Sequence, residues 1–171
     1  MSQLDIPNGH IFEVEGATFR SFHCPGHTDD HTAFVLKEEN AMFTGDNVLG
    51  HGTAVFEDLA TYLQSLDEMQ QQFSGRAYPG HGDVISDGVA RIKEYIAHRQ
   101  QREDQVLHNL GDETPRTAME LVKVIYKDVP ENLHEPASKG VLQILQKLKT
   151  QGKVLTPDGG VCWQLGERPT L

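Results

Sequence analysis

The chain has 171 residues and an apolar fraction of 37%, which suits one globular domain with a modest core or a small domain with an appendage. No apolar run approaches the roughly 20 residues that cross a bilayer. The first residues also lack the basic start and apolar stretch of a secretory signal, so we expect a cytoplasmic protein without a membrane partner. Cys24 and Cys162 lie far apart, which favours reduced thiols over a disulfide.

The net charge of −10 is unevenly distributed along the chain. Residues 1–115 carry 7 Lys and Arg against 19 Asp and Glu, a net of −12. Residues 116–171 carry 8 against 6, a net of +2. An acidic first part disfavours a polyanion as its ligand, so we consider a nucleic-acid partner unlikely.

Short runs rich in aromatic and β-branched residues predict a sheet in the first part of the chain. The expected strands are residues 11–14, 17–22, 32–36, 41–43 and 76–78. Between the last two, apolar residues recur at spacings of three and four from Glu57 to Phe73, which predicts an amphipathic helix packed on the sheet. Ser86 and Asp87 can cap a second helix that runs to about Leu110 and whose charged residues predict a mostly solvated face.

The chain changes character after a break at residues 111–115. Two helices are expected at residues 117–127 and 138–151, followed by a hairpin of residues 154–156 and 161–165 around a Pro-Asp-Gly-Gly turn. Helices followed by a small hairpin predict a winged-helix-like unit, and we place the two domains at residues 1–110 and 111–171. An alternative role for the second helix is phosphate contact through Lys139, Lys147, Lys149 and Lys153, but four lysines are ordinary for an exposed helix.

Three short motifs each place a metal-ligating side chain directly after a glycine. They are Pro-Gly-His-Thr ending at Thr28, Thr-Gly-Asp ending at Asp46, and Pro-Gly-His-Gly ending at Gly82. A glycine lets the backbone turn sharply and hold an imidazole or carboxylate at a strand end. His27, Asp46 and His81 are therefore the candidate metal ligands, because a hydrolytic zinc site needs imidazoles and carboxylates around an open position for water.

In this order and spacing, 19 residues and then 35, the motifs resemble the second half of the metallo-β-lactamase superfamily. The resemblance implies an α/β class fold: the C-terminal half of a four-layer αββα sandwich, followed by the winged-helix-like unit. It also implies two Zn²⁺ ions, with His27 on the first, Asp46 bridging both and His81 on the second. Half of a sandwich would expose a broad apolar face, which normally demands a partner.

The upstream half of that family contributes a His-x-His-x-Asp-His run, which holds further ligands and the aspartate assigned to proton transfer. No two of the nine histidines here are separated by a single residue, so the run does not occur in this sequence. We therefore assign no catalytic residue. The half-built site leaves open a truncated, non-catalytic remnant or a chain that depends on a partner, and a homo-oligomer is one form that such a partner could take.

Residues 44–59 carry a more specific resemblance, to the lactamase-like thioesterases of fungal aromatic polyketide clusters such as the atrochrysone carboxyl carrier-protein thioesterases. This implies a zinc-dependent hydrolase that releases a polyketide acyl chain from the acyl-carrier domain of a non-reducing polyketide synthase in secondary-metabolite biosynthesis. The carrier domain and a small-molecule acyl group are then its partners. A looser resemblance, to the mitochondrial lactamase-like endoribonucleases, keeps RNA cleavage as an alternative.

Several residues near the motifs have weaker signals. We expect His31 to support the first motif rather than ligate metal, and Cys24 to be a small buried residue beside it. Asp29 and Asp30 are candidate partners of a ligand histidine. His51 lies on a loop that should face the site, where it either touches substrate or is a flexible loop residue. The remaining histidines, His10, His23, His98, His108 and His134, have no constellation around them.

Overall fold

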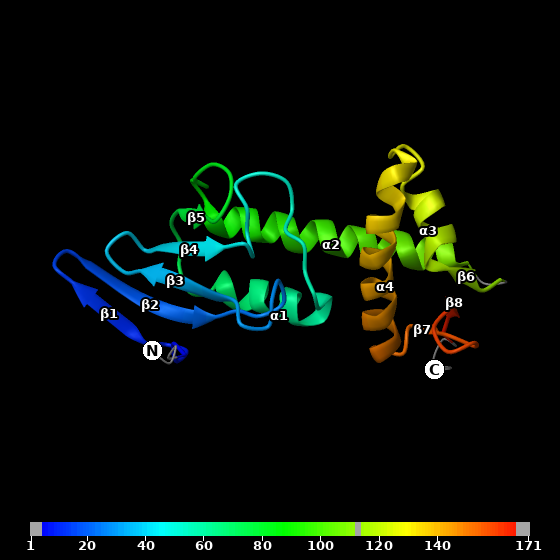
Figure 1. The fold of residues 1–171 in the computed structure, drawn as a ribbon, viewed down its shortest axis with the longest axis horizontal. Coiled ribbons are helices and arrows are strands. Elements are labelled where there is room, and N and C mark those ends of the chain that lie inside the picture. The colour runs from blue at the N-terminus through cyan, green and yellow to red at the C-terminus, as the bar shows by residue number, and fades with distance from the viewer. Residues whose placement is uncertain (1–4, 112–113, 167–171) are drawn as a thin grey trace. The chain divides into compact units, whose positions relative to one another are not determined.

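The computed structural model of the chain describes residues 5–111 and 114–166. Asp112 and Glu113, in the predicted break, lie outside the described residues, as do residues 1–4 and 167–171. The chain divides into two compact units, Met1–His98 and Arg99–Leu171. The division falls inside helix α2 (Gly88–Leu110), whereas the sequence pattern changes only after residue 110. Figure 1 gives the element labels used below.

The first unit contains a five-stranded sheet with the strand order β1-β2-β3-β4-β5. Its strands are β1 (Ile11–Val14), β2 (Ala17–His23), β3 (Thr32–Leu36), β4 (Ala41–Gly45) and β5 (Ala77–Pro79). The first four pair antiparallel in sequence order, but β5 pairs parallel to β4, with Gly45 opposite Pro79. Because parallel strands point the same way, the segments after β4 and β5 emerge at the same edge of the sheet.

Helix α1 (Leu59–Met69) provides the crossover between β4 and β5. It is shorter than the 57–73 segment predicted, because Asp58 caps its start by accepting a hydrogen bond from the Thr61 N–H at 2.7 Å and the backbone turns after Met69. Asp87 accepts from the Ala90 N–H at 2.9 Å and so caps α2 as expected. Residues of both helices and of the sheet share one core cluster, which includes Val35, Met42, Tyr62, Leu66, Met69, Ile92 and Tyr95.

The opposite face of the sheet carries aromatic side chains. Alternation along a strand sends Val35 into the core and its neighbour Phe34 to the other side. Phe12, Phe19, Phe34 and Phe43 line an apolar hollow of about 420 Å³ there, and Phe43 stacks on Tyr78 with ring centroids 4.8 Å apart. The apolar face predicted for half of a sandwich is therefore present.

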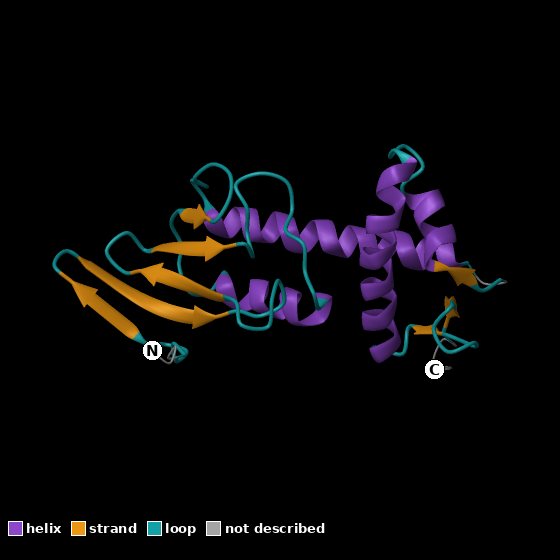
Figure 2. Cartoon of the chain, viewed as in Figure 1, coloured by secondary structure: helices purple, strands orange, loops and turns teal. Residues whose placement is uncertain are grey.

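The second unit has the elements of a winged helix (Figure 2). They are β6 (Arg116–Thr117), α3 (Ala118–Ile125), the 3-10 turn η1 (Glu131–Leu133), α4 (His134–Thr150), β7 (Val154–Leu155) and β8 (Cys162–Leu165). Its sheet has the order β6-β8-β7. Thr117 and Glu120 form a reciprocal capping box that starts α3. Helix α4 begins four residues earlier than predicted, because Pro136 lies in its first turn, where proline costs no hydrogen bond.

One charged residue of α2 departs from the predicted solvated face. The Glu103 side chain is only 3% exposed and forms ion pairs with Lys147 and Lys153, the latter at 3.6 Å. A carboxylate buried among apolar residues requires such partners. Across residues 5–111 and 114–166, no helix combines the length and hydropathy that a membrane span requires.

Candidate functional site

Asp46 and His81 are brought together by the parallel pairing of β4 and β5. The Gly80 N–H donates to the Gly45 carbonyl at 2.8 Å, which joins the residue after β5 to the last residue of β4. A Cβ atom on Gly80 would lie 2.6 Å from Asp46 Oδ1. Glycine at this position therefore gives the Asp46 carboxylate the space that any side chain would fill.

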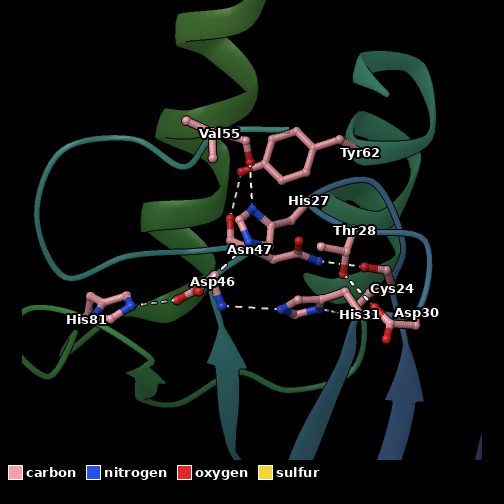
Figure 3. A network of polar contacts seen from close by, with 10 residues as sticks. All are labelled: Cys24, His27, Thr28, Asp30, His31, Asp46, Asn47, Val55, Tyr62 and His81. Atoms are coloured by element: carbon pink, nitrogen blue, oxygen red, sulfur yellow. Dashed lines mark hydrogen bonds and ion pairs between the residues drawn. The ribbon is translucent and has the colours of Figure 1, made fainter. Parts of the chain in front are cut away.

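The two predicted ligand histidines converge on the carboxylate of the third predicted ligand, Asp46 (Figure 3). His27 Nε2 lies 3.8 Å from Asp46 Oδ2, and His81 Nε2 lies 3.5 Å from Asp46 Oδ1. The two imidazoles thus approach different oxygens of one carboxylate. The His27 side chain is 21% exposed, Asp46 38% and His81 69%, so the site opens toward solvent on its His81 side.

A backbone carbonyl fixes the His27 imidazole. His27 Nδ1 lies 2.8 Å from the Val55 oxygen, which can only accept, so Nδ1 donates there and Nε2 is the ring nitrogen that faces Asp46. Asp29 and Asp30 do not have the partner role expected of them. The Asp30 carboxylate accepts from the Thr28 hydroxyl at 2.8 Å, and Asp29 contacts His23 through its backbone oxygen.

The loop before His27 depends on a close approach to helix α1. Gly26 has φ +126°, and a Cβ on it would lie 2.3 Å from the Tyr62 Cα. The Gly26 carbonyl also accepts from the Glu57 N–H at 2.8 Å. Only glycine permits this contact, which carries the following histidine up to the carboxylate of Asp46.

His31 holds the backbone of Asp46 rather than joining the two other histidines. Its Nε2 accepts from the Asp46 N–H at 3.2 Å, so Nδ1 bears the proton and donates to Cys24 Sγ at 3.3 Å. Burial lowers the pKa of His31 and favours this neutral form. Burial also raises the pKa of Cys24 to about 12, which keeps it a thiol. Both residues therefore have the supporting positions that the sequence predicts.

Asn47 anchors the chain on the other side of Asp46. Its side-chain amide nitrogen donates to the Cys24 backbone carbonyl at 2.7 Å, and its backbone carbonyl accepts from the Tyr62 hydroxyl at 2.6 Å. Asn47 and Tyr62 are both fully buried, so the backbone of Asp46 is fixed from the protein interior. No motif revealed this arrangement, because its acceptors are backbone atoms.

Imidazole nitrogen and carboxylate oxygen are the donors that zinc prefers, so the three side chains fit the ion in chemistry. They fit less well in number. Within residues 5–111 and 114–166, no group of three or more His, Cys, Asp or Glu side chains is placed to hold one ion. The donors instead form two pairs that share Asp46, whereas catalytic zinc ordinarily has three protein ligands. Metal binding by His27, Asp46 and His81 thus stays a prediction.

Comparison with known protein families finds two matches. Residues 2–81 match the metallo-beta-lactamase superfamily, and residues 117–163 match the beta-lactamase associated winged helix domain. The first match contains all three predicted ligands. The second covers the helices and hairpin of the second unit.

Among curated relatives, the chain is 45% identical over 161 residues to the lactamase-like protein ptaB of Pestalotiopsis fici, a match that covers 89% of this chain and 51% of the relative. It is 44% identical over 160 residues to an atrochrysone carboxyl ACP thioesterase of Aspergillus chevalieri, with 89% and 52% covered. The chain thus spans about half the length of these relatives. A solved metallo-beta-lactamase family protein from Thermus thermophilus superposes with a TM-score of 0.79 at 29% identity, over 96% of this chain and 55% of that one.

Proposed function

The chain belongs to the metallo-β-lactamase superfamily through residues 2–81 and carries a β-lactamase-associated winged-helix domain at residues 117–163, and from this premise we propose that it is a thioester hydrolase. Its substrate is a polyketide acyl chain held by the acyl-carrier domain of a non-reducing polyketide synthase. The relative named as an atrochrysone carboxyl ACP thioesterase supports this substrate class, since it matches 89% of the chain.

The observation that carries the proposal is the approach of two imidazoles to opposite oxygens of Asp46. Two zinc ions held by His27, Asp46 and His81 would polarise the thioester carbonyl and lower the pKa of water. Because the hydrogen bond to Val55 occupies Nδ1, Nε2 is the His27 nitrogen left for a metal ion. Asp46 offers one oxygen to each side. The exposed His81 side leaves room for an acyl group that arrives on a bulky carrier domain.

The proposal assigns no proton acceptor. His31 is committed to the Asp46 backbone and Cys24, and Cys24 is a buried thiol. One observation favours a second candidate: the hollow lined by Phe12, Phe19, Phe34 and Phe43 offers a partner an apolar surface. In this alternative the chain is inactive alone and works only with a polypeptide that covers that face and adds metal ligands.

An RNA substrate is less well supported. Two of the four lysines that could contact phosphate, Lys147 and Lys153, are directed at the buried Glu103. The acidic balance of residues 1–115 also opposes a polyanion near the site. Both features favour the thioesterase over the ribonuclease.

The test is hydrolysis of an acyl-carrier thioester and of a small acyl thioester by the 171-residue chain, followed by release of free thiol. We expect activity that a chelator abolishes and zinc restores, and that His81→Ala lowers at least ~100-fold. His108→Ala, which removes an exposed histidine of α2, is the matched control and should leave the rate unchanged. Cleavage of single-stranded RNA without thioester hydrolysis would replace the proposal with the ribonuclease, and neither activity would favour the partner-dependent chain.

A further inference from the structure

Two glycines flank His81, and each leaves space for a side chain from another loop. A Cβ on Gly80 would lie 2.6 Å from Asp46 Oδ1, and a Cβ on Gly82 would lie 2.4 Å from His51 Nδ1. Asp46 thus lies against the residue before His81, and His51 lies against the residue after it. Gly82 also has φ +88° and lies against the backbone of Gly50 and His51, so glycine is required there both by its conformation and by the loop that carries His51.

The loop that carries His51 touches the His81 turn through its backbone. The Gly50 N–H donates to the His81 carbonyl at 2.9 Å. A Cβ on Gly50 would lie 2.2 Å from the Asp83 carbonyl oxygen, so this contact too requires glycine. The two backbones thus approach more closely than side chains would permit. His51 is the next residue after Gly50, where the two loops meet.

Helix α2 also holds this loop. The Tyr95 hydroxyl accepts from the Leu49 N–H at 3.1 Å and donates to the Gly52 carbonyl at 3.1 Å. Arg91 donates to the same carbonyl at 2.9 Å and lies over the Tyr95 ring, 5.1 Å from its centroid. These bonds fix the residues on both sides of His51, so the loop is braced rather than free to swing.

The His51 side chain itself is exposed and unused. Among residues 5–111 and 114–166 its imidazole has no hydrogen-bond partner, although a neutral imidazole offers one donor and one acceptor. A braced loop that presents an exposed imidazole beside His81, with its nitrogens open to solvent, is suited to contact a ligand. The flexible loop residue considered from the sequence does not need such bracing.

We propose that His51 is a substrate-contacting residue that hydrogen-bonds an oxygen of the acyl chain while the thioester lies over Asp46 and His81. The inference rests on the proposed thioesterase function and narrows its substrate class. A polyketide chain carries carbonyl and hydroxyl oxygens along its length, whereas a saturated fatty acyl chain carries none beyond the thioester. His51 thus selects oxygenated acyl groups over plain alkyl ones.

The experiment compares two thioesters of N-acetylcysteamine that differ by one oxygen, acetoacetyl and butyryl. The ratio of their kcat/KM values is measured for the wild-type chain, His51→Ala, His51→Gln and the control His108→Ala. We expect His51→Ala to lower the acetoacetyl value about fivefold, through KM, with the butyryl value unchanged. His51→Gln, which keeps a donor and an acceptor, should restore part of the ratio, and the control should not move it.

Bound zinc is measured on the same preparations, since a ligand and a substrate contact differ there. We expect His51→Ala to keep the wild-type zinc content and His81→Ala to lose it. Loss of zinc from His51→Ala would overturn the inference and make His51 a ligand. Active wild-type protein whose substrate ratio is unchanged in His51→Ala would overturn the inference alone. Wild-type protein that hydrolyses neither thioester would overturn both the inference and the proposed function.

Discussion

The two histidines on either side of Asp46 are held in different ways. His27 is mostly buried, and its second nitrogen is bonded to the Val55 carbonyl. His81 is 69% exposed, and the bonds that place it are made by its backbone and by Gly80. The first imidazole is therefore oriented by a hydrogen bond to a backbone atom, whereas the second is placed by its backbone and approaches Asp46 from the solvent side. One imidazole is held from the protein interior and the other faces solvent.

The largest expected effect is at Gly26, which allows the His27 loop to lie against α1. Gly26→Ala would place a Cβ 2.3 Å from the Tyr62 Cα and would force alanine to adopt φ +126°. We expect a loss of ~3–5 kcal/mol in the free energy of unfolding, because backbone has to move. Chemical denaturation measures it.

Gly16→Ala is the matched control for that substitution. Gly16 has φ +83°, but a Cβ there meets nothing within 4 Å. Gly16→Ala should lower the free energy of unfolding by ~1 kcal/mol, because it has only the cost of the positive φ and no clash. Equal losses for the two variants would show that the approach of Gly26 to the helix is unimportant.

Asp46 tests whether the two sides form one site. Asp46→Ala removes the carboxylate that both imidazoles approach, so we expect zinc affinity to fall by ~100-fold or more, beyond the loss in either His27→Ala or His81→Ala. Competition with a chromophoric chelator measures the affinity. If Asp46→Ala bound zinc as well as either histidine variant, the carboxylate would not bridge the two sides.

A smaller effect on stability is expected at Tyr62, which supports the backbone next to Asp46. Tyr62→Phe removes the hydroxyl that donates to the Asn47 carbonyl in a fully buried setting, so we expect a loss of ~1–2 kcal/mol in unfolding free energy. Thermal unfolding of the zinc-free chain measures it.

Tyr95→Phe is the corresponding variant on the His81 side. It loosens the loop that carries His51, so it should change thioester kinetics more than zinc affinity. Indistinguishable behaviour of the two variants would remove the distinction between the two sides.

The two paired lysines illustrate what sequence reasoning lacked in the second unit. Helix and hairpin were predicted there and are confirmed by the winged-helix match, but the pattern of the sequence indicates surface charges at Lys147 and Lys153. Their partner Glu103 lies 44 residues before Lys147, on a helix whose charged residues predict a mostly solvated face. Strand β6 was also missed, because two residues are too few to produce an alternating pattern.

The sequence alone determined the strands and helices of the first unit, the order of its three motifs and the glycine before each candidate ligand. These features are local: hydrophobic period and backbone freedom are properties of a few consecutive residues. Tertiary structure alone decided that Val55 occupies Nδ1 of His27, that Gly82 yields its space to His51 and that Tyr95 braces the loop between them. Each of these depends on a backbone atom or an empty volume supplied by a distant segment. Such features cannot be read from which residue types occur in the sequence.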